Sequence, residues 1–381
     1  LRSGKLSGFI ALDNEYFLGG PCVLKLEELI SQSVGVKHAI SVNSWTSGLI
    51  CAVGALDTEP GDEIITSSWT MSATASAILH LNCIPVFADI NPLTYNIDPF
   101  SVEQLITSRT KAVLAVDIFG LSCDIPALTE ICAKHGLVLI TDSAQAPLST
   151  IHGSYAGTLA DIGGYSFNSH KHIQTGEGGI LLTNNDKIAR RMQLLRNHAE
   201  ACLRPEDSLS NMVGYNFRLG EIEAAIAYQQ FLKLPAIIKS RQQFANQLSS
   251  SLSSLPGLIL PHVPTGYSHV YYVYPLQLDL DQLQTDRDYI VRALIAERVP
   301  VSPGYTNIHL LPIYQNQQAY GSANFPWSLN PHTHNYSIGS LPVAEALHSR
   351  SFIGLGLCNH ELTSDLIGQF AEAFHKVWGS L

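Results

Sequence analysis

A regular alternation of short apolar runs and helical patterns, from about residue 25 to residue 240, is the feature that most constrains the fold of this chain. An uninterrupted apolar strand has no polar face to turn toward water, so both faces of its sheet must be covered. Such strands separated by helices predict an α/β fold with a mostly parallel sheet between two helical layers. We expect strands at 38–42, 63–65, 85–87, 112–116 and 138–141, and helices at 23–34, 46–56, 72–80 and 126–135.

After residue 240 the pattern changes, which predicts a second domain. We expect a large domain with an N-terminal arm over 1–240 and a smaller C-terminal α/β domain over 241–381. The stretch 304–340 is rich in Pro, Tyr, Asn and His and is interpreted as a long ordered loop. The remaining predicted elements are helices at 221–234, 237–252, 283–297 and 364–378, and strands at 271–278 and 299–303.

Composition and charge exclude several classes of protein. Of the 381 residues, 46% are hydrophobic and 14% are charged, which is typical of a compact globular chain. The formal net charge of −10 argues against nucleic acid or an anionic membrane as the main partner. No apolar run approaches the roughly eighteen residues that span a bilayer, and the first residues lack the apolar core of a signal peptide.

The cysteines and histidines carry no pattern of a disulfide framework or a metal site. Seven cysteines are scattered without C-x-x-C spacing, so a reducing cytoplasm is the simplest location. Fifteen histidines lack a spacing such as H-E-x-x-H, and we therefore predict no metal.

One segment, SFNSHKHIQTGEGG at 166–179, carries most of the functional information. Lys171 lies between a strand end and a glycine-rich turn that leads into the apolar run at 180–182. A lysine held there can form a Schiff base with a carbonyl cofactor if packing lowers its pKa. The glycines would let the backbone pass close beneath a flat ring.

This segment resembles the S-F-H-x-x-K-x-[IL]-T-T-G-E-G-G signature of the DegT/DnrJ/EryC1/StrS sugar aminotransferases. The resemblance implies a fold-type-I transferase with a seven-stranded type of sheet, and pyridoxal phosphate (PLP) carried on Lys171. Further matching stretches, among them those at 18–21, 60–63, 96–99 and 341–345, extend the resemblance over nearly the whole chain.

Asp142 ends an expected strand and opens the loop Asp142-Ser143-Ala144-Gln145-Ala146. A carboxylate there could keep the pyridine nitrogen of PLP protonated, or it could simply be a helix N-cap. The similar E-D-A-A-Q-A loop of the family implies the first role for Asp142, and a place on the ring face for Gln145.

Ser44, Trp45 and Thr46 lie between an expected strand and the start of a helix. Backbone N–H groups at a helix N-terminus suit a phosphate, although a serine or threonine at this position is also an ordinary cap. The family has S-G-T here, so Trp45 replaces a glycine, and the family also implies that Ser166 holds the phosphate.

Trp69 and Met71 align with the family stretch P-S-F-T-W-V-A-T, in which an aromatic side chain stacks on the cofactor ring. Met71 replaces the last aromatic residue, so either it or Trp69 could contact the ring. The alternative is that both belong to the core.

The stretch Gly214-Tyr215-Asn216-Phe217-Arg218 matches the family's G-Y-N-x-R. The match implies that Asn216 reaches the cofactor phosphate of the neighbouring subunit, in a homodimer with shared active sites. Arg218 is a contact of substrate or phosphate, or else a partner in a surface ion pair. His198 follows a helix that could face the cleft, and is a second candidate for substrate binding.

These features predict a PLP-dependent aminotransferase that moves an amino group from glutamate, or glutamine, to a keto sugar, which we expect to be linked to a nucleotide. Substrate should contact the loops at 304–340 and 199–210. Two alternatives are a PLP-dependent sugar dehydratase, which in the family has histidine in place of the lysine, and a PLP-binding sensor without turnover.

Overall fold

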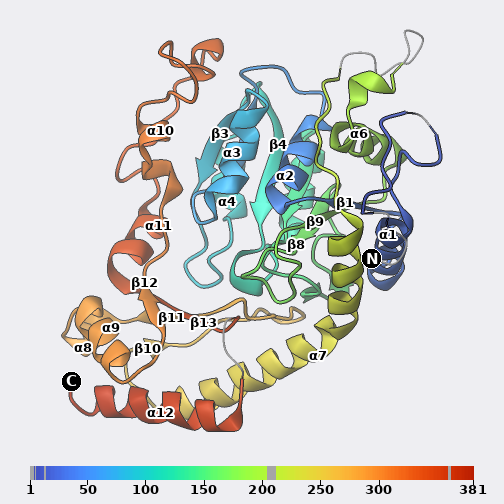
Figure 1. Ribbon diagram of the computed structural model, residues 1–381. Coiled ribbons are helices and arrows are strands. Elements are labelled where there is room, and N and C mark those ends of the chain that lie inside the picture. The colour runs from blue at the N-terminus through green and yellow to red at the C-terminus, as the bar shows by residue number, and fades with distance from the viewer. Residues whose placement is uncertain (1–3, 5, 13, 204–211, 359–361) are drawn as a thin grey trace.

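The computed structural model describes residues 4, 6–12, 14–203, 212–358 and 362–381. Part of the loop expected to contact substrate, residues 204–210, lies outside the described residues. Figure 1 shows a central sheet between helices, and a smaller C-terminal sheet beside the long helix α7 (Glu221–Leu252).

The central sheet has seven strands in the order β3-β2-β4-β5-β8-β9-β1. Strand β9 is antiparallel to both of its neighbours, and the other pairs that the structure records in this sheet are parallel, as expected. A parallel bridge from Ile140 to Ile162 joins β5 to the segment that leads into β8. The strands are β1 (His38–Val42), β2 (Glu63–Ser67), β3 (Ile84–Ala88), β4 (Thr110–Val116), β5 (Val138–Asp142), β8 (Gly163–Ser166) and β9 (Gly179–Thr183).

Helices cover both faces of this sheet, which confirms the prediction from its apolar strands. Leu114 and Val116 of β4 pack in the same cluster as residues of α2, α3 and α6. Val113 and Ala115, which point the opposite way, pack with α4 and α5. Farther along that second face, α1 and α7 cover β9 and β1. The helices are α1 (Pro21–Val34), α2 (Trp45–Gly54), α3 (Ser72–His80), α4 (Pro99–Gln104), α5 (Ile125–His135) and α6 (Asp186–Arg196).

The C-terminal part forms an antiparallel sheet in the order β10-β11-β13-β12. One face of it packs on α9, α12 and the end of α7, and these elements share a separate apolar cluster. The division of the chain at residue 240 stays a prediction. The elements are β10 (Leu258–Ile259), β11 (Val273–Leu278), α8 (Leu280–Leu283), α9 (Arg287–Ala296), β12 (Val301–Pro303), β13 (Phe352–Gly356) and α12 (Ser364–Trp378).

Two predictions of secondary structure were wrong, and strand β13 was not predicted. The helices expected at 221–234 and 237–252 are one curved helix, α7, which continues through Pro235 because its buried positions continue on both sides. The helix expected at 283–297 is broken where Gln284 adopts a left-handed conformation, with φ of 54°. Strand β13 was missed because its two glycines weaken the strand pattern.

The segment 304–340 is ordered and lies against the central sheet. Its aromatic residues pack edge to face around Phe87 of β3, as the ring centroid distances of 5.0 Å to Tyr314 and 5.6 Å to Tyr336 show. Short helical turns, a β-hairpin and the link to β13 complete the described elements: β6 (Thr150–Ile151), β7 (Ser154–Tyr155), η1 (Ile118–Gly120), η2 (Ala199–Ala201), η3 (Ile308–Leu310), α10 (Pro312–Gln315), η4 (Trp327–Leu329), α11 (Pro342–Ala346) and the π-helical turn η5 (Leu347–Ser351).

Candidate active site

A cavity of about 380 Å³ lies where β5 and β8 end and α2 begins. Ligands of open α/β sheets are expected at these carboxyl ends of the strands. The cavity contains both Lys171 and Asp142, which are far apart in the sequence. Its lining consists of Ser44, Trp45, Thr46, Thr70, Met71, Ala73, Val116, Asp142, Ala144, Gln145, Ser166, Asn168, His170, Lys171, Glu177 and Tyr272.

Lys171 lies in the turn between β8 and β9, where its backbone N–H donates to the Asn168 carbonyl at 2.9 Å. Its Nζ lies 4.5 Å from the centre of the Tyr272 ring. Burial lowers the pKa of Lys171, although the charges of Asp142 and Cys358 oppose this shift. The lowered pKa leaves more of the amine neutral near neutral pH, which a nucleophile or a base requires.

The carboxylate of Asp142 is buried and accepts three hydrogen bonds from the chain. Its Oδ1 accepts from the Trp45 indole Nε1 at 2.7 Å and from the Ala144 backbone N–H at 3.2 Å. Its Oδ2 accepts from the Thr74 hydroxyl at 2.8 Å. Turns rather than a helix follow Asp142, so the alternative role as a helix N-cap was wrong.

The start of α2 forms one wall of the cavity. Ser44 is the N-cap, since its hydroxyl accepts from the Ser47 backbone N–H at 3.1 Å. The N–H groups of Trp45 and Thr46 have no intrahelical partner, as at every helix start. A Cβ at Gly179 would come within 3.0 Å of the Trp45 backbone N, so a glycine there leaves that group uncovered. An anion could bind here beside Ser166.

Of the three candidates for contact with the cofactor ring, two line the cavity and one does not. Gln145 lines the cavity, and its Oε1 accepts from the Phe119 backbone N–H at 2.7 Å. Met71 also lines the cavity and is 60% exposed. Trp69 does not line it: this residue is fully buried, and its Nε1 donates to Asn307 Oδ1 at 2.7 Å. The structure therefore favours the core role that was left open for Trp69.

The three remaining candidates lie outside the lining of this cavity. Asn216 is exposed, and its backbone carbonyl accepts from Asn43 Nδ2 at 3.3 Å. Arg218 donates to Asn197 Oδ1 at 2.9 Å and lines a neighbouring cavity that shares Glu177 with the first. His198 adopts a left-handed conformation, with φ of 53°, at the end of α6.

Sequence reasoning missed Thr74, Glu177 and Tyr272. Thr74 reaches Asp142 from α3, and Tyr272 approaches Lys171 from the segment before β11. No local sequence motif marks Thr74 or Tyr272, because each is far from Lys171 in the sequence and comes near the site only through the fold. Glu177 is part of the quoted segment, where its carboxylate accepts from Asn168 Nδ2 at 3.0 Å. Its position in that segment was the available signal.

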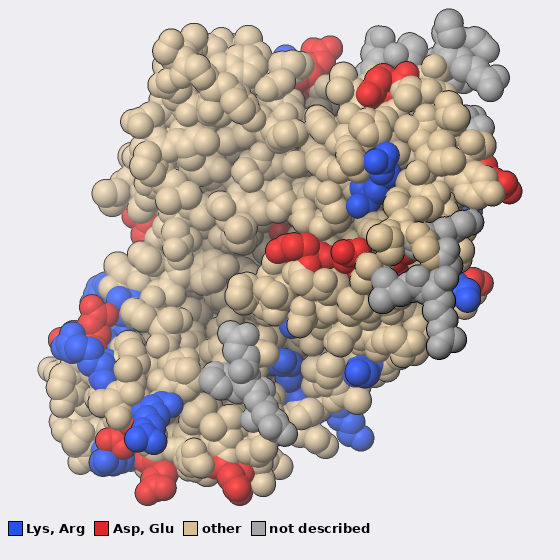
Figure 2. All heavy atoms as spheres, viewed as in Figure 1, with Lys and Arg blue, Asp and Glu red and all other residues tan. Residues whose placement is uncertain are grey.

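Figure 2 shows the lysines and arginines of this face in separate small groups among the described residues. In the described part of the chain there is no cluster of three or more His, Cys, Asp or Glu that could hold a metal. The described helices include none that is long and apolar enough to cross a membrane. All seven cysteines are described, and none forms a disulfide.

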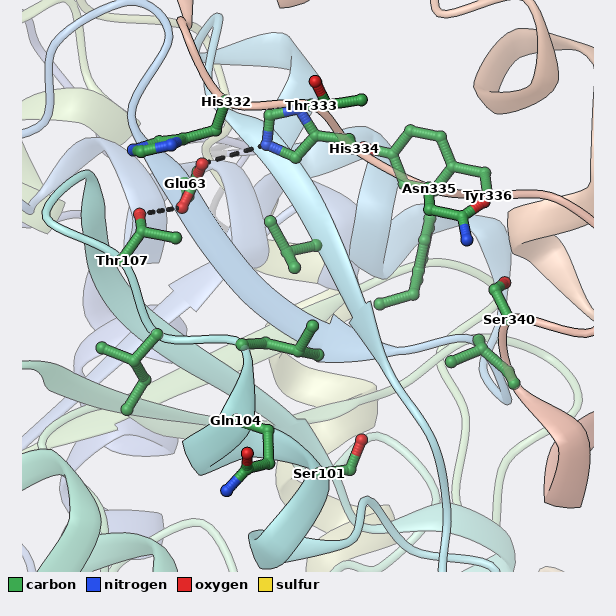
Figure 3. Close-up of a pocket in the computed structure, with 15 residues that line it drawn as sticks. Glu63, Ser101, Gln104, Thr107, His332, Thr333, His334, Asn335, Tyr336 and Ser340 are labelled. Carbon is green, nitrogen blue, oxygen red and sulfur yellow. Dashed lines mark hydrogen bonds and ion pairs between the residues drawn. The ribbon is translucent and has the colours of Figure 1, made fainter.

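A second cavity, of about 370 Å³, lies at the amino end of β2, beside Glu63 (Figure 3). Asp142 lies at the opposite end of the parallel strands, since it is the last residue of β5. Glu63 begins β2 at this cavity, and its Oε1 lies 3.0 Å from His334 Nε2 of the loop 304–340. Burial raises the pKa of Glu63, but hydrogen bonds from His334, Thr107 and Asn330 outweigh this effect and lower it to about 2. Glu63 therefore ties the loop to the sheet.

We expect Glu63→Gln to lower the free energy of unfolding by about 2 kcal/mol at pH 7, because a buried charged acceptor is lost. The pKa of Glu63 is lowered on folding, so its contribution is present above the unfolded value of about 4.3 and is lost as pH falls toward 2. Urea unfolding across this pH range should therefore show the free energies of unfolding of the wild type and of Glu63→Gln converging as pH falls. Glu130 is exposed, so Glu130→Gln is the control. If Glu63→Gln lowers the free energy of unfolding equally at every pH, the stabilising role of the Glu63 charge is contradicted.

Comparison with known proteins places the chain among aminotransferases. The sequence profile of the DegT/DnrJ/EryC1/StrS aminotransferase family matches residues 10–351. The chain is 34% identical to the spore coat polysaccharide biosynthesis protein SpsC of Bacillus subtilis (strain 168) over 340 residues, which cover 87% of each chain. It is 34% identical to a GDP-perosamine synthase of Caulobacter vibrioides, with 77% of this chain and 79% of the relative covered. Among solved structures it is similar to Helicobacter pylori PseC, an aminotransferase involved in the biosynthesis of pseudoaminic acid, with a TM-score of 0.81, 27% identity and coverage of 95% and 92%.

Proposed function

This chain belongs to the DegT/DnrJ/EryC1/StrS aminotransferase family, and we propose that it uses PLP to move an amino group from glutamate or glutamine to a keto sugar. The observation that carries this proposal is the presence of Lys171 and Asp142 in one cavity at the carboxyl ends of the strands. A GDP-perosamine synthase among the relatives supports a nucleotide-linked acceptor as the first class to test.

The residues around the cavity fit PLP. Lys171 offers an amine whose pKa burial lowers, and Asp142 offers a buried carboxylate for the pyridine nitrogen. For the phosphate we propose Ser166 and the start of α2, formed by Ser44, Trp45 and Thr46, where Gly179 leaves the backbone uncovered. We propose that Gln145 and Met71 pack near the ring, because both line the cavity. Trp69 would support this site only from the core.

When bound, PLP would supply a sink for the electrons released as a C–H bond of the amino donor breaks. Lys171 would take the proton from the α-carbon of the donor as a general base and return it elsewhere as an acid. The lowered pKa of Lys171 suits both directions of this transfer.

The arrangement around Lys171 argues against the dehydratase alternative. That activity would need histidine in place of Lys171, yet this lysine lines the cavity. His172 lies outside it, with Nε2 at 2.8 Å from the Val270 carbonyl, and burial lowers the pKa of His172 to about 3. A PLP-bound sensor is the remaining alternative, and an absorbance band that glutamate does not change would favour it.

The acceptor sugar has room beside the proposed cofactor site. A neighbouring cavity of about 460 Å³ shares Thr70 and Met71 with it. The loop 304–340 contributes Tyr305 and Thr306, and His348 approaches from η5. Hydroxyl groups and a titratable imidazole suit the hydroxyls of a sugar. Arg218 and His198 stay proposed contacts for substrate from the edge of the site.

The proposal is tested by incubating the PLP-loaded protein with ¹⁵N-labelled glutamate or glutamine and a panel of keto sugars. The panel should include nucleotide-linked sugars, keto-cyclitols and free keto-sugar acids. Mass spectrometry is expected to find ¹⁵N in one amino-sugar product. Release of 2-oxo acid without a labelled sugar would show that no sugar in the panel is the acceptor. If neither the 2-oxo acid nor a labelled sugar forms, aminotransferase activity is rejected.

We also propose a homodimer with shared sites, in which Asn216 of the partner subunit reaches the phosphate. Asn216 is exposed and does not line the cavity of its own chain. The nearby Val213, Ile222 and Ile226 expose 72%, 42% and 42% of their surface, which supports a contact with a second copy. The cysteines, which are scattered along the sequence without C-x-x-C spacing, support a cytoplasmic location.

Mixing two inactive variants tests this assembly. We expect Lys171→Ala and Asn216→Glu each to be inactive alone, and activity to return when their subunits exchange. One site of the mixed dimer then combines an intact Lys171 with an intact Asn216, and random exchange gives about half mixed dimers. Activity of Asn216→Glu alone, or no recovery after confirmed exchange, would show that Asn216 does not complete the partner's site.

A further inference from the structure

The indole of Trp45 lies in a slot beside Asp142 and contacts the carboxylate directly. Trp45 is only 6% exposed, and its Nε1 donates to Asp142 Oδ1 at 2.7 Å. Tryptophan at this place departs from the S-G-T pattern that the sequence otherwise resembles. Its backbone N–H is a proposed contact of the cofactor phosphate, whereas its side chain points to Asp142, the proposed partner of the pyridine nitrogen.

Glycines make room for this indole. A Cβ at Gly48, inside α2, would lie 2.8 Å from Cε3 and 2.9 Å from Cζ3 of Trp45. A Cβ at Gly164 of β8 would lie 2.4 Å from Cη2, and it would also meet the Ile180 carbonyl. Neither glycine has a positive φ, so backbone conformation does not require them. A glycine inside a helix is less stable than alanine by about 1 kcal/mol, so Gly48 is best explained by the space that the indole needs.

The hydrogen bonds within the chain use three of the four acceptor positions of the Asp142 carboxylate. A carboxylate has about four acceptor positions, two on each oxygen. Trp45 and the Ala144 N–H occupy two positions on Oδ1, and Thr74 occupies one on Oδ2. The Thr74 hydroxyl also lies 2.7 Å from the Thr70 hydroxyl, which helps to fix its direction. One position on Oδ2 is left.

We propose that Trp45 is a positioning residue that holds the Asp142 carboxylate in one orientation, with a single acceptor position on Oδ2 available to the pyridine N–H. This inference rests on the proposed function, because it assigns Asp142 to the cofactor. Without the indole, Oδ1 retains only the longer bond from Ala144, so the carboxylate can rotate and the pairing with the cofactor weakens.

The test is a double-mutant cycle between Trp45→Phe and Asp142→Asn. Trp45→Phe is expected to lower kcat about tenfold, the factor that corresponds to the loss of one charge-assisted hydrogen bond. The KM for the amino donor should change less than about twofold, since the donor does not bind to Asp142. The dissociation constant of PLP, measured by equilibrium dialysis, should rise several-fold. In the Asp142→Asn background, Trp45→Phe should change neither kcat nor the dissociation constant of PLP by more than about twofold.

Two matched controls separate positioning from stability. Trp378→Phe also removes an indole hydrogen bond, here to the Pro256 carbonyl at 2.8 Å, but at the end of α12 and outside the lining of the cavity, and should leave kcat and cofactor binding unchanged. Gly48→Ala should copy Trp45→Phe, although helix propensity alone would make it stabilising. Gly368→Ala, in α12 with no atom within 4 Å of its Cβ position, should leave kcat unchanged.

Equal losses from Trp45→Phe in both backgrounds, or wild-type behaviour of Gly48→Ala, would overturn the positioning role. The proposed function would survive either result, because the wild-type protein would still bind PLP. A wild-type protein that binds no PLP would instead overturn the proposed function and this inference together.

Discussion

Lys171→Ala is expected to abolish amino transfer, because it removes both the proposed attachment point of PLP and the group that moves the proton. Noncovalent binding of PLP should persist, since the start of α2 and Asp142 are unchanged. Reduction of the wild-type protein with borohydride should fix the cofactor mass on the peptide that contains Lys171. The exposed Lys239→Ala is the control and should keep full activity. A label on another lysine, or activity in Lys171→Ala, would remove the basis of the assignment.

Without cofactor, the difference in stability between Lys171→Ala and the wild type is expected to depend on pH. Burial lowers the pKa of Lys171, so between its folded pKa and its unfolded pKa of about 10.4 the unfolded chain binds more protons than the folded chain, and stability rises with pH. The wild-type lysine therefore weakens folding at neutral pH, and less so as pH rises. Lys171→Ala should unfold at a higher temperature than wild type at pH 7, and this advantage should shrink toward pH 10. An advantage that does not change with pH would contradict a buried, titrating amine.

The sequence predicted the central sheet well because its strands are buried on both faces. Continuous apolar runs such as 112–116 admit few other interpretations, and β4 covers this run. The antiparallel direction of β9 was not predictable, since an apolar run does not record its direction. Pro235 misled the prediction of α7 because local propensity argues for a break, while packing against α1 and α12 keeps the helix continuous.

Sequence motifs pointed to candidate residues that follow strands, but not to those that tertiary packing brings into the same cavity. Lys171, Asp142 and Gln145 were found because each lies in a short motif at a strand end, and the structure brings them into one cavity. Thr74 and Tyr272 have no such motif. For Trp69 the sequence left contact with the ring and a place in the core open, because a position in a motif does not fix the direction of a side chain. In the structure this side chain turns into the aromatic cluster with Phe352.

Asp142→Asn is expected to slow proton transfer by about two to three orders of magnitude, the effect of removing one partner from a buried charge pair. The substitution is nearly isosteric. The remaining amide oxygen can still accept from Trp45 Nε1 and the Ala144 N–H, and the new NH₂ group can donate to the Thr74 hydroxyl. The fold should therefore be retained, and thermal unfolding of the protein without cofactor would verify this.

The amide differs from the carboxylate in one respect that matters for the chemistry: it carries no negative charge to keep the pyridine nitrogen protonated. Stopped-flow absorbance of the PLP-loaded variant with glutamate should show the slow step directly, and deuterium at the α-carbon of glutamate should slow it further. A variant that is folded, binds PLP and reacts at a near-normal rate would mean that Asp142 only orders the turn through Ala144. The negative charge at the end of β5 would then have no part in the reaction.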